Sequence, residues 1–339
     1  MTTSFVARAV LLGVLLGACA GHGERLATED TSPRSFAFAL IGDLGYRPEQ
    51  EPWLENVLTD LKTSPASLAF VVHVGDLGHP RFGSCTNELW ARRLAQFQAS
   101  PHPLIYTPGD NEWTDCHEKG GAPGYDPLER LARLRTVFFP SEQSLGGRTL
   151  ALTRQSRTSD PALVKYRENV RWTHGGITFV TLHVVGSNNG RGRTPEGDAE
   201  YAERNAANLA WLREGFAAAR TSRSRAIMIM QQANIFHEFP PIPSELAAQQ
   251  NGFTDLRALL ERETIAFGKP VVLVHGDSHF FRVDKPLGAG GATPAVENFT
   301  RVETFGQPNH HWLQVTVEVD EPQVFTFRQR IVAANVIKR

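Results

Sequence analysis

The chain has 339 residues, of which 41% are hydrophobic, 21% are charged and 3 are cysteines. This composition is typical of a globular protein with a sizeable core, and it excludes intrinsic disorder, a disulfide-dense mini-fold and a Cys-rich zinc module. Because 35 Lys and Arg stand against 36 Asp and Glu, the formal net charge is -1. No long-range field attracts nucleic acid or an anionic membrane surface, and we expect no nucleic-acid partner.

The first 18 residues are typical of a secretory signal. One charge, Arg8, precedes an apolar run over residues 9–16 that is too short to span a bilayer. The LGAC motif at residues 16–19 resembles the bacterial lipobox, which implies cleavage before Cys19 and lipidation of its thiol. The alternative is a plain signal peptide that leaves a soluble exported protein. Both interpretations predict export, and the first predicts a lipoprotein at the periplasmic face of the bacterial envelope, anchored in the membrane through Cys19.

After the signal, residues 19–34 form a short polar stretch that we expect to be a tether, and residues 35–339 form one large domain. If Cys19 is lipidated, Cys85 and Cys116 remain as an even pair in an oxidising compartment. They predict a disulfide, with two independent thiols as the alternative.

Within the domain, strand and helix patterns alternate. Buried-strand runs occur at residues 35–41, 68–74, 103–106, 177–185, 226–230 and 271–274, with helical patterns at 52–62, 87–98, 199–220 and 253–267. Residues 170–173 form a hairpin with 177–185, and further strand patterns cover 312–319 and 324–332. Residues 117–165 are rich in Gly, Pro and Arg and carry one helical island near 128–137, so we expect a long insertion or lid there. The order predicts an α/β fold with added antiparallel strands.

Gly-Asp turns follow four of these strand patterns, at residues 42–43, 75–76, 109–110 and 276–277. In open α/β sheets, ligands bind beyond the carboxyl ends of the strands, which is where these turns fall. One such turn is usually only a turn, but several carboxylates that converge would repel each other strongly. A bound cation is the natural compensation, so the pattern predicts a metal site.

The ordered motifs GDLG (42–45), GD (75–76), GDNE (109–112) and GDSH (276–279) resemble those of the calcineurin-like metallophosphoesterases, including their purple-acid-phosphatase branch. The resemblance covers about residues 36–285. It implies a four-layer α/β/β/α sandwich of the metallophosphoesterase type. It also implies two divalent metal ions, drawn from Mn, Mg, Zn, Fe or Ca, joined by a bridging carboxylate.

Carried over position by position, the resemblance makes Asp76 the bridging ligand. Asp43 and His279 match ligands of the first metal, and His79 stands where purple acid phosphatases have a Tyr ligand. The second metal would take Asp110, Gln232 and Asp277, where the family usually has Asn, His and His. An all-oxygen set suits Mn, Mg or Ca better than a nitrogen-rich zinc or iron site, so the second ion is expected to be hard, weakly held or absent.

A further departure is Asn111, which stands where the family has the His that assists the leaving group. An amide does not transfer protons near neutral pH. Three alternatives stay open: His117 or Asp115 substitutes for that His, the leaving group is already a weak base, or the chemistry is impaired.

A polar, Gly-rich turn follows residues 177–185, and two readings of it are open. Its side chains Asn188, Asn189, Arg191 and Arg193 would contact a substrate phosphate, or the turn is simply a solvated loop. Elsewhere we expect His73 in the core and His310 and His311 at the surface.

The sequence thus predicts an exported metal-dependent phosphoesterase that hydrolyses a phosphate mono- or diester with a metal-activated water. One alternative is a catalytically impaired metal- or phosphate-binding envelope protein on the same scaffold. Another is an envelope interaction protein that uses residues 117–165 as its contact surface. The substrate, the metals and the oligomeric state stay open at this stage.

Overall fold

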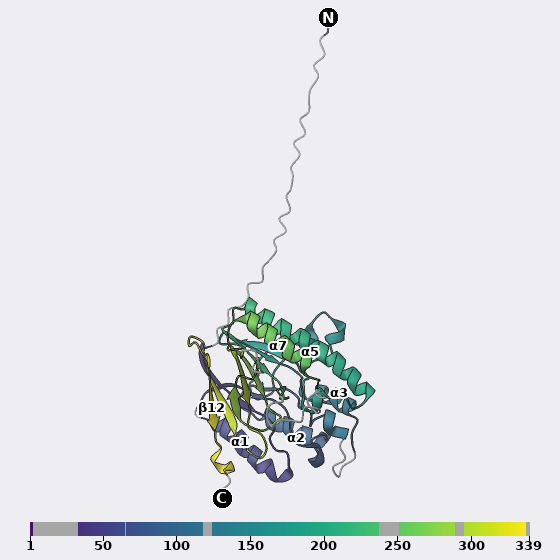
Figure 1. The fold of residues 1–339 in the computed structure, drawn as a ribbon, viewed down its shortest axis with the longest axis vertical. Helices are drawn as coiled ribbons and strands as arrows, with labels where there is room; N and C mark the ends of the chain where they lie inside the picture. Colours follow the sequence, from purple (N-terminus) through teal and green to yellow (C-terminus); the bar gives the residue numbers. More distant parts are fainter. Residues whose placement is uncertain (3–32, 65, 118–123, 237–250, 289–294, 337–339) are drawn as a thin grey trace.

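The computed structural model describes residues 1–2, 33–64, 66–117, 124–236, 251–288 and 295–336 (Figure 1). The expected signal peptide (all but its first two residues), the lipidation site Cys19 and most of the tether therefore lie outside the described residues, as do residues 118–123 of the expected insertion. Within the described ranges, no helix has the length and apolar character needed to cross a membrane.

Two sheets form the centre of the fold. In the described chain, the first sheet has the strand order β12-β11-β1-β2-β3 and the second β4-β5-β6-β7-β8-β10-β9. The first contains β1 Ser35–Ile41, β2 Leu68–His73, β3 Leu104–Tyr106, β11 Trp312–Glu318 and β12 Phe325–Arg330. The second contains β4 Thr153–Arg154, β5 Val170–His174, β6 Ile177–Thr181, β7 Ala226–Met230, β8 Val271–His275, β9 Arg282–Asp284 and β10 Phe299–Glu303. Strands β1 to β3 run parallel, as do β6, β7, β8 and β10, and antiparallel strands extend both sheets.

Helices cover the outer face of each sheet. The helices are α1 Glu51–Thr63, α2 Asn87–Gln98, α3 Pro127–Phe138, α4 Gly186–Asn189, α5 Pro195–Thr221 and α7 Thr254–Phe267. Short 3-10 turns are η1 Pro48–Gln50, η2 Pro80–Phe82, η3 Thr114–His117, η4 Gln155–Arg157, η5 Pro161–Leu163 and η6 Ala333–Asn335. Figure 1 shows α5 and α7 side by side on one side of the molecule, with α1 and α2 on the opposite side.

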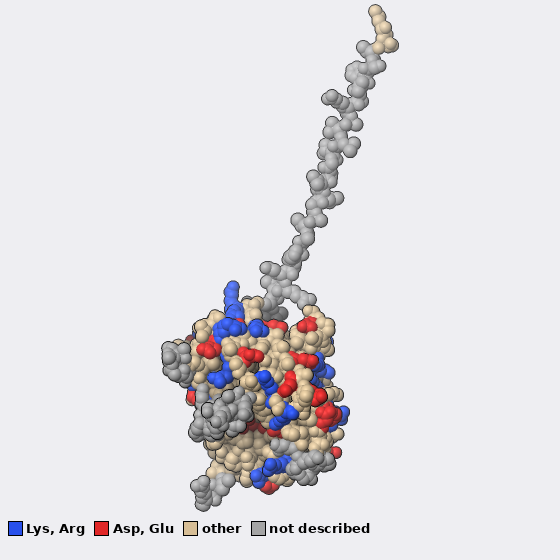
Figure 2. Space-filling model, turned by 45° about the vertical axis from the view of Figure 1, so that its right-hand side comes forward, with Lys and Arg blue, Asp and Glu red and all other residues tan. Residues whose placement is uncertain are grey.

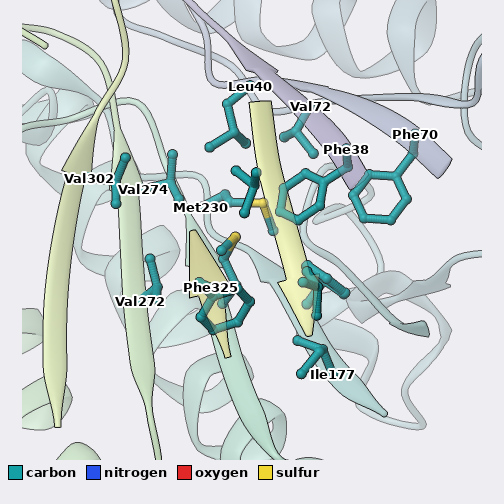
Figure 3. Close-up of a cluster of buried hydrophobic side chains, with 14 of the residues drawn as sticks. Phe38, Leu40, Phe70, Val72, Ile177, Met230, Val272, Val274, Val302 and Phe325 are labelled. Atoms are coloured by element: carbon teal, nitrogen blue, oxygen red, sulfur yellow. The ribbon is translucent and has the colours of Figure 1, made fainter. Parts of the chain in front are cut away.

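Alternation along the strands gives three main layers of buried apolar side chains, one between the two sheets and one between each sheet and its helices. Phe38 and Leu40 of β1 point between the sheets, where they meet Met230 and Val274 of the second sheet (Figure 3). The intervening residues of β1 pack instead against α1 to α3, and the other face of the second sheet packs against α5 and α7. Period-two alternation produces this double-sided burial. The fold is a four-layer α/β/β/α sandwich of the metallophosphoesterase type, as predicted.

Capping residues mark the start of two helices, and α5 begins at Pro195, four residues before the expected start. Thr194 caps α5 by accepting a hydrogen bond from Gly197 N at 3.0 Å, and Pro195 occupies the first helical position. Asp126 caps α3 through Leu128 N at 2.9 Å. The helical island near residues 128–137 is thus confirmed as α3, inside the expected insertion.

One surface prediction is wrong. His310 is 1% exposed, and its Nε2 accepts a hydrogen bond from Gly45 N at 3.1 Å while its ring packs edge-on against Trp53. The pair precedes β11 rather than lying on a strand, so strand alternation does not govern it. His73 is buried as predicted, with Nδ1 accepting from Gly75 N at 3.2 Å.

Charges of both signs are interspersed over the face shown in Figure 2, without one large block of either sign. This distribution agrees with the near-zero net charge of the chain. Any anionic ligand must therefore be captured by local groups rather than by a long-range field.

Candidate functional site

Polar turns converge at the carboxyl ends of the parallel strands. Asp43 follows β1, Asp76 follows β2, Asp110 follows β3, and Asp277 and His279 follow β8. Nine non-Gly residues of the described chain have a left-handed backbone, and four of them are Asp43 (φ 56°), Asp76 (φ 58°), Asp277 (φ 74°) and His279 (φ 66°). Such conformations are costly and gather at functional sites. Four of the seven sequence-predicted ligands are therefore held in strained turns.

Tyr46 is the centre of the first half of the site, and the sequence motifs did not indicate it. Its hydroxyl donates a hydrogen bond to Asp76 and lies 3.2 Å from Asp43 Oδ1 and 3.1 Å from His279 Nε2. The opposite ring nitrogen of His279 bonds to Gln307 O at 2.8 Å, which fixes the ring orientation. Side chains from three different turns thus meet at one phenol oxygen.

Asp110 and Asp277 form the second half of the site, around Gly186 in the turn after β6. A Cβ at Gly186 would lie 2.7 Å from Asp110 Oδ2 and 2.8 Å from Asp277 Oδ1. Only glycine leaves room for the two carboxylates to approach the same point. Asp277 also connects the halves, because its backbone N–H donates to Asp43 Oδ1 at 3.1 Å.

Gln232 lies beneath this second half, but its carbonyl oxygen is already engaged. Gly186 N donates to Gln232 Oε1 at 2.6 Å, while the side-chain nitrogen is buried without a partner among the described residues. The amide is fully buried and does not line the open cavity. Its assignment as a metal ligand stays a prediction.

The two halves open into one cavity of about 420 Å³. Its walls contain Tyr46, Arg47, Asp76, His79, Arg81, Phe82, Asp110, Asn111, Asp277, His279 and Gln307. His79 therefore reaches the cavity, and its Nδ1 accepts from Arg81 N at 3.2 Å. A volume of this size suits a small-molecule ligand.

The carboxylates raise one another's pKa. Burial, together with the nearby carboxylates of Asp110, Glu112 and Asp43, raises the pKa of Asp76 well above its usual value. Burial and the carboxylates of Asp115 and Asp277 do the same to the pKa of Asp110.

Asp277 and His279 are shifted too. Burial raises the pKa of Asp277 to about 6. Although burial alone would lower the pKa of His279, the Asp43 carboxylate beside it raises that pKa. Across the described chain, no Lys or Arg forms an ion pair with any of the four site aspartates.

These features fit a divalent cation. Asp43 Oδ2 is a buried carboxylate oxygen with no hydrogen-bond partner among the described residues, and His279 is the only cationic side chain of those residues that forms an ion pair with the site aspartates. Even so, no three His, Cys, Asp or Glu side chains of the described ranges already form a ready coordination group. Tyr46 explains part of this, because its hydroxyl lies between Asp43, Asp76 and His279. The donor set is rich in oxygen, which suits hard cations.

Of the three candidate catalytic residues, only Asn111 lines the cavity. Its side-chain nitrogen donates to Asp76 Oδ2 at 2.8 Å, and its backbone N–H donates to Asp76 Oδ1 at 3.3 Å. Asp115 pairs with Arg193 at 2.6 Å and accepts from Ser187 Oγ at 2.9 Å. His117 is exposed, with Nδ1 bonded to Thr114 O at 2.8 Å. A proton-transfer role for either substitute stays a prediction.

The turn at residues 186–193 is bound to its neighbours rather than merely solvated. Arg193 is paired with Asp115, and Arg191 Nη1 donates to Asn251 Oδ1 at 2.6 Å. Asn189 Oδ1 accepts from Arg204 Nη1 at 2.5 Å, and Asn188 Oδ1 accepts from Gly252 N at 3.0 Å. None of the four side chains predicted to contact phosphate lines the cavity.

The disulfide between Cys85 and Cys116 is confirmed, with an S–S distance of 2.00 Å and a Cα–Cα distance of 5.7 Å. It joins the segment after β2 to the segment after β3. Next to it, Ser84 Oγ donates to Asn111 O at 2.5 Å. The covalent link therefore braces the turn that presents Asn111 to Asp76.

The sequence patterns did not indicate five cavity residues: Tyr46, Arg47, Arg81, Phe82 and Gln307. Tyr46 had a usable signal, because it stands three residues after Asp43, the same spacing that drew attention to His79 after Asp76. The other four lie in short turns or loops, where no periodicity marks a function.

Comparison with known proteins supports the fold. The chain is similar to the structure of PhoD, with a TM-score of 0.54 and 12% sequence identity over 89% of this chain and 69% of that one. A carbon-nitrogen hydrolase from Helicobacter pylori G27 aligns over 89% of this chain and 91% of that one at 11% identity, but its TM-score of 0.28 carries no weight. No family model and no curated protein matches the chain.

Proposed function

We propose that the chain is a metal-dependent phosphoesterase that hydrolyses a phosphate mono- or diester. The observation that carries the proposal is the meeting of Asp76, Asp110, Asp277 and His279 at one cavity, with the buried Asp43 hydrogen-bonded to Asp277 N. No Lys or Arg of the described chain forms an ion pair with any of these aspartates. The likeness of the fold to that of PhoD adds support. The purple-acid-phosphatase-like branch is a finer part of the same proposal and rests on the motifs.

In this proposal, Asp43, Asp76, His279 and Tyr46 hold one divalent ion, while Asp76, Asp110 and Asp277 hold a second. Such ions, when bound, polarise phosphoryl oxygens and lower the pKa of a coordinated water. The residues of the chain set the positions: Asn111 fixes Asp76 through two hydrogen bonds, and Gln307 fixes the ring of His279.

Asn111 also favours a second candidate function. Since an amide does not supply a proton near neutral pH, a substrate with a strongly basic leaving group would receive no help at that position. The second candidate is therefore a catalytically impaired protein that binds metal or phosphate on the same scaffold.

An assay separates the two candidates. The purified protein is stripped with chelator, reloaded with Mn, Mg, Zn, Fe or Ca, and assayed with aryl phosphate mono- and diesters. We expect turnover that depends on metal, and we expect Asp76→Asn to lose both the metal and at least about a hundredfold of the activity. Glu88→Gln, an exposed carboxylate on α2, is the control that should change neither. Stoichiometric metal without turnover would favour the impaired binding protein, and absence of both would refute the metal site.

We also propose that the protein is exported and anchored at the periplasmic face of the envelope through lipidated Cys19. The signal-like residues 1–18 and the Cys85–Cys116 disulfide support this, because disulfides persist in oxidising compartments. Mass analysis of the mature N-terminus tests it. A diacylated Cys19 would support anchoring, whereas an unmodified residue at the mature N-terminus would support the plain signal peptide.

A further inference from the structure

One wall of the cavity differs from its acidic floor. Arg47, Arg81 and Phe82, here called the mouth wall, line the same cavity as Asp76 and Asp277. All three mouth-wall side chains are exposed, and Phe82 is 45% exposed. They come from two turns, one after β1 and the other, η2 Pro80–Phe82, after β2.

Phe82 is not part of the packed core. It belongs to none of the buried apolar clusters of the described chain. Its neighbours are the ring of His79, with centroids 6.0 Å apart, and the guanidinium of Arg47, 5.4 Å from the ring centroid. Burial does not account for a large aromatic ring at this position, whereas a ligand that stacks on the ring would.

The rings also define a direction. Tyr46 lies at the acidic floor, its ring is 6.0 Å from that of His79, and the ring of His79 is 6.0 Å from that of Phe82. Tyr46 is buried and Phe82 is exposed. The series of rings therefore runs from the proposed phosphate-binding floor to the outer edge of the cavity.

The mouth wall is also cationic. Arg47 has one ionic neighbour, Glu49, at 3.9 Å with both side chains largely exposed, and Arg81 has no ion pair or side-chain hydrogen bond within the described ranges. Guanidinium groups bind phosphate oxygens and stack on planar rings. Two such groups beside an exposed aromatic ring suit an anionic ligand with a flat aromatic part.

We infer that the mouth wall selects phosphate esters of planar aromatic alcohols or of nucleosides, with the ring stacked on Phe82 and the anionic part held near Arg47 and Arg81. This inference deepens the proposed function and rests on it for the position of the phosphate. An alkyl or glycerol ester would fill the floor of the cavity but would have no ring to stack on Phe82. Phe82 is then a specificity-determining residue rather than a catalytic one.

The test measures binding and turnover separately on the full protein loaded with Mn. Calorimetry compares adenosine 5′-monophosphate with glycerol 3-phosphate, and kinetics compare an aryl phosphate with an alkyl phosphate. We expect the wild type to bind the nucleotide more tightly. We expect Phe82→Ala to weaken nucleotide binding and to raise KM for the aryl ester by about tenfold, with glycerol 3-phosphate unchanged. Phe82→Tyr should restore the preference.

Ile265→Ala, an exposed apolar position on α7, is the matched control and should change nothing. Arg81→Gln should weaken both phosphates by a similar factor, because both carry the anionic group. Equal affinity of the wild type for the two phosphates, or an equal loss for both in Phe82→Ala, would overturn the inference. Calorimetry does not depend on turnover, so an inactive protein that still prefers the nucleotide would refute the proposed hydrolysis and support the mouth wall.

Discussion

Two buried groups of charges lie close together in this molecule and behave in opposite ways. At the acidic floor, burial and mutual repulsion raise the pKa values of Asp76, Asp110 and Asp277. Glu168 is equally buried, and burial alone would raise its pKa, but the Arg135 guanidinium holds that pKa well below its usual range. The first group has no ion pair with a Lys or Arg among the described residues, whereas Glu168 is paired with Arg135.

The counter-charge of Glu168 lies within the chain. Arg135 Nη2 lies 2.6 Å from Glu168 Oε1, and His183 Nδ1 lies 2.8 Å from the same oxygen. His183 in turn packs edge-on against Trp113, three residues beyond Asp110. One group stabilises the fold behind the site, and the other would hold a cation under the proposed function. The comparison therefore separates structural charge from functional charge.

The largest expected effect comes from breaking the pair of Arg135 and Glu168. We expect Arg135→Ala to lower the free energy of unfolding by about 3–5 kcal/mol, because Glu168 would be left buried and unpaired. Urea unfolding measures the change. Arg157→Ala removes an ion pair with Glu142 whose side chains are 71% and 35% exposed, and it should cost less than about 1 kcal/mol. Equal losses of unfolding free energy in Arg135→Ala and Arg157→Ala would mean that the buried pair is worth no more than an exposed one.

The pH dependence of stability sharpens the same contrast. The pKa of Glu168 is lower in the folded state than in the unfolded state, so the unfolded state binds more protons as the pH falls. The stabilisation is fully present above the unfolded pKa of about 4.3 and is lost as the pH falls below it. Burial also lowers the pKa of His183. Stability is therefore lost through His183 too as the pH falls, beginning near the ordinary histidine pKa of about 6.5.

We therefore expect acid to remove about 3 kcal/mol of stability through Glu168 as the pH falls from about 4.5 toward 2. Glu168→Gln should be less stable at neutral pH but should show a flatter acid limb. Urea unfolding at a series of pH values measures both. An acid limb of the same steepness in the variant would assign the loss to other groups.

The sequence predicted much of this site because its signal is local. Each Gly-Asp turn is contiguous with a buried strand, so the parallel order alone brings Asp43, Asp76 and Asp110 to one edge. The hydrogen bond from Gly186 N to Gln232 Oε1 could not be predicted in this way. It depends on how β6 and β7 pair, and the local sequence does not contain that pairing.

Exposed and charged positions were the least predictable. Phe82 and Arg81 lie in a three-residue turn without periodicity. Strand β10, Phe299–Glu303, was not predicted because Arg301 and Glu303 give it a polar pattern, although both are buried and paired with Asp284 and Arg282. Partners distant in the sequence decide such positions, and a linear pattern does not contain them.

The smallest expected effect is a gain of stability, opposite in sign to the loss in Arg135→Ala. It tests the acidic floor. In chelator near pH 8, Asp277→Asn should raise the free energy of unfolding by about 1 kcal/mol, because it removes a buried charge whose pKa lies at about 6. The amide retains an oxygen to accept the hydrogen bond from Asn234 N. Saturating Mn should make the wild type more stable than the variant. A ligand at 100 times its Kd stabilises the wild type by about 2.7 kcal/mol, and we expect it to stabilise the variant by less. Urea unfolding with chelator and with Mn measures both states. A variant that is less stable than the wild type in chelator would mean that the chain itself compensates Asp277, and the proposed cation at this half of the site would be refuted.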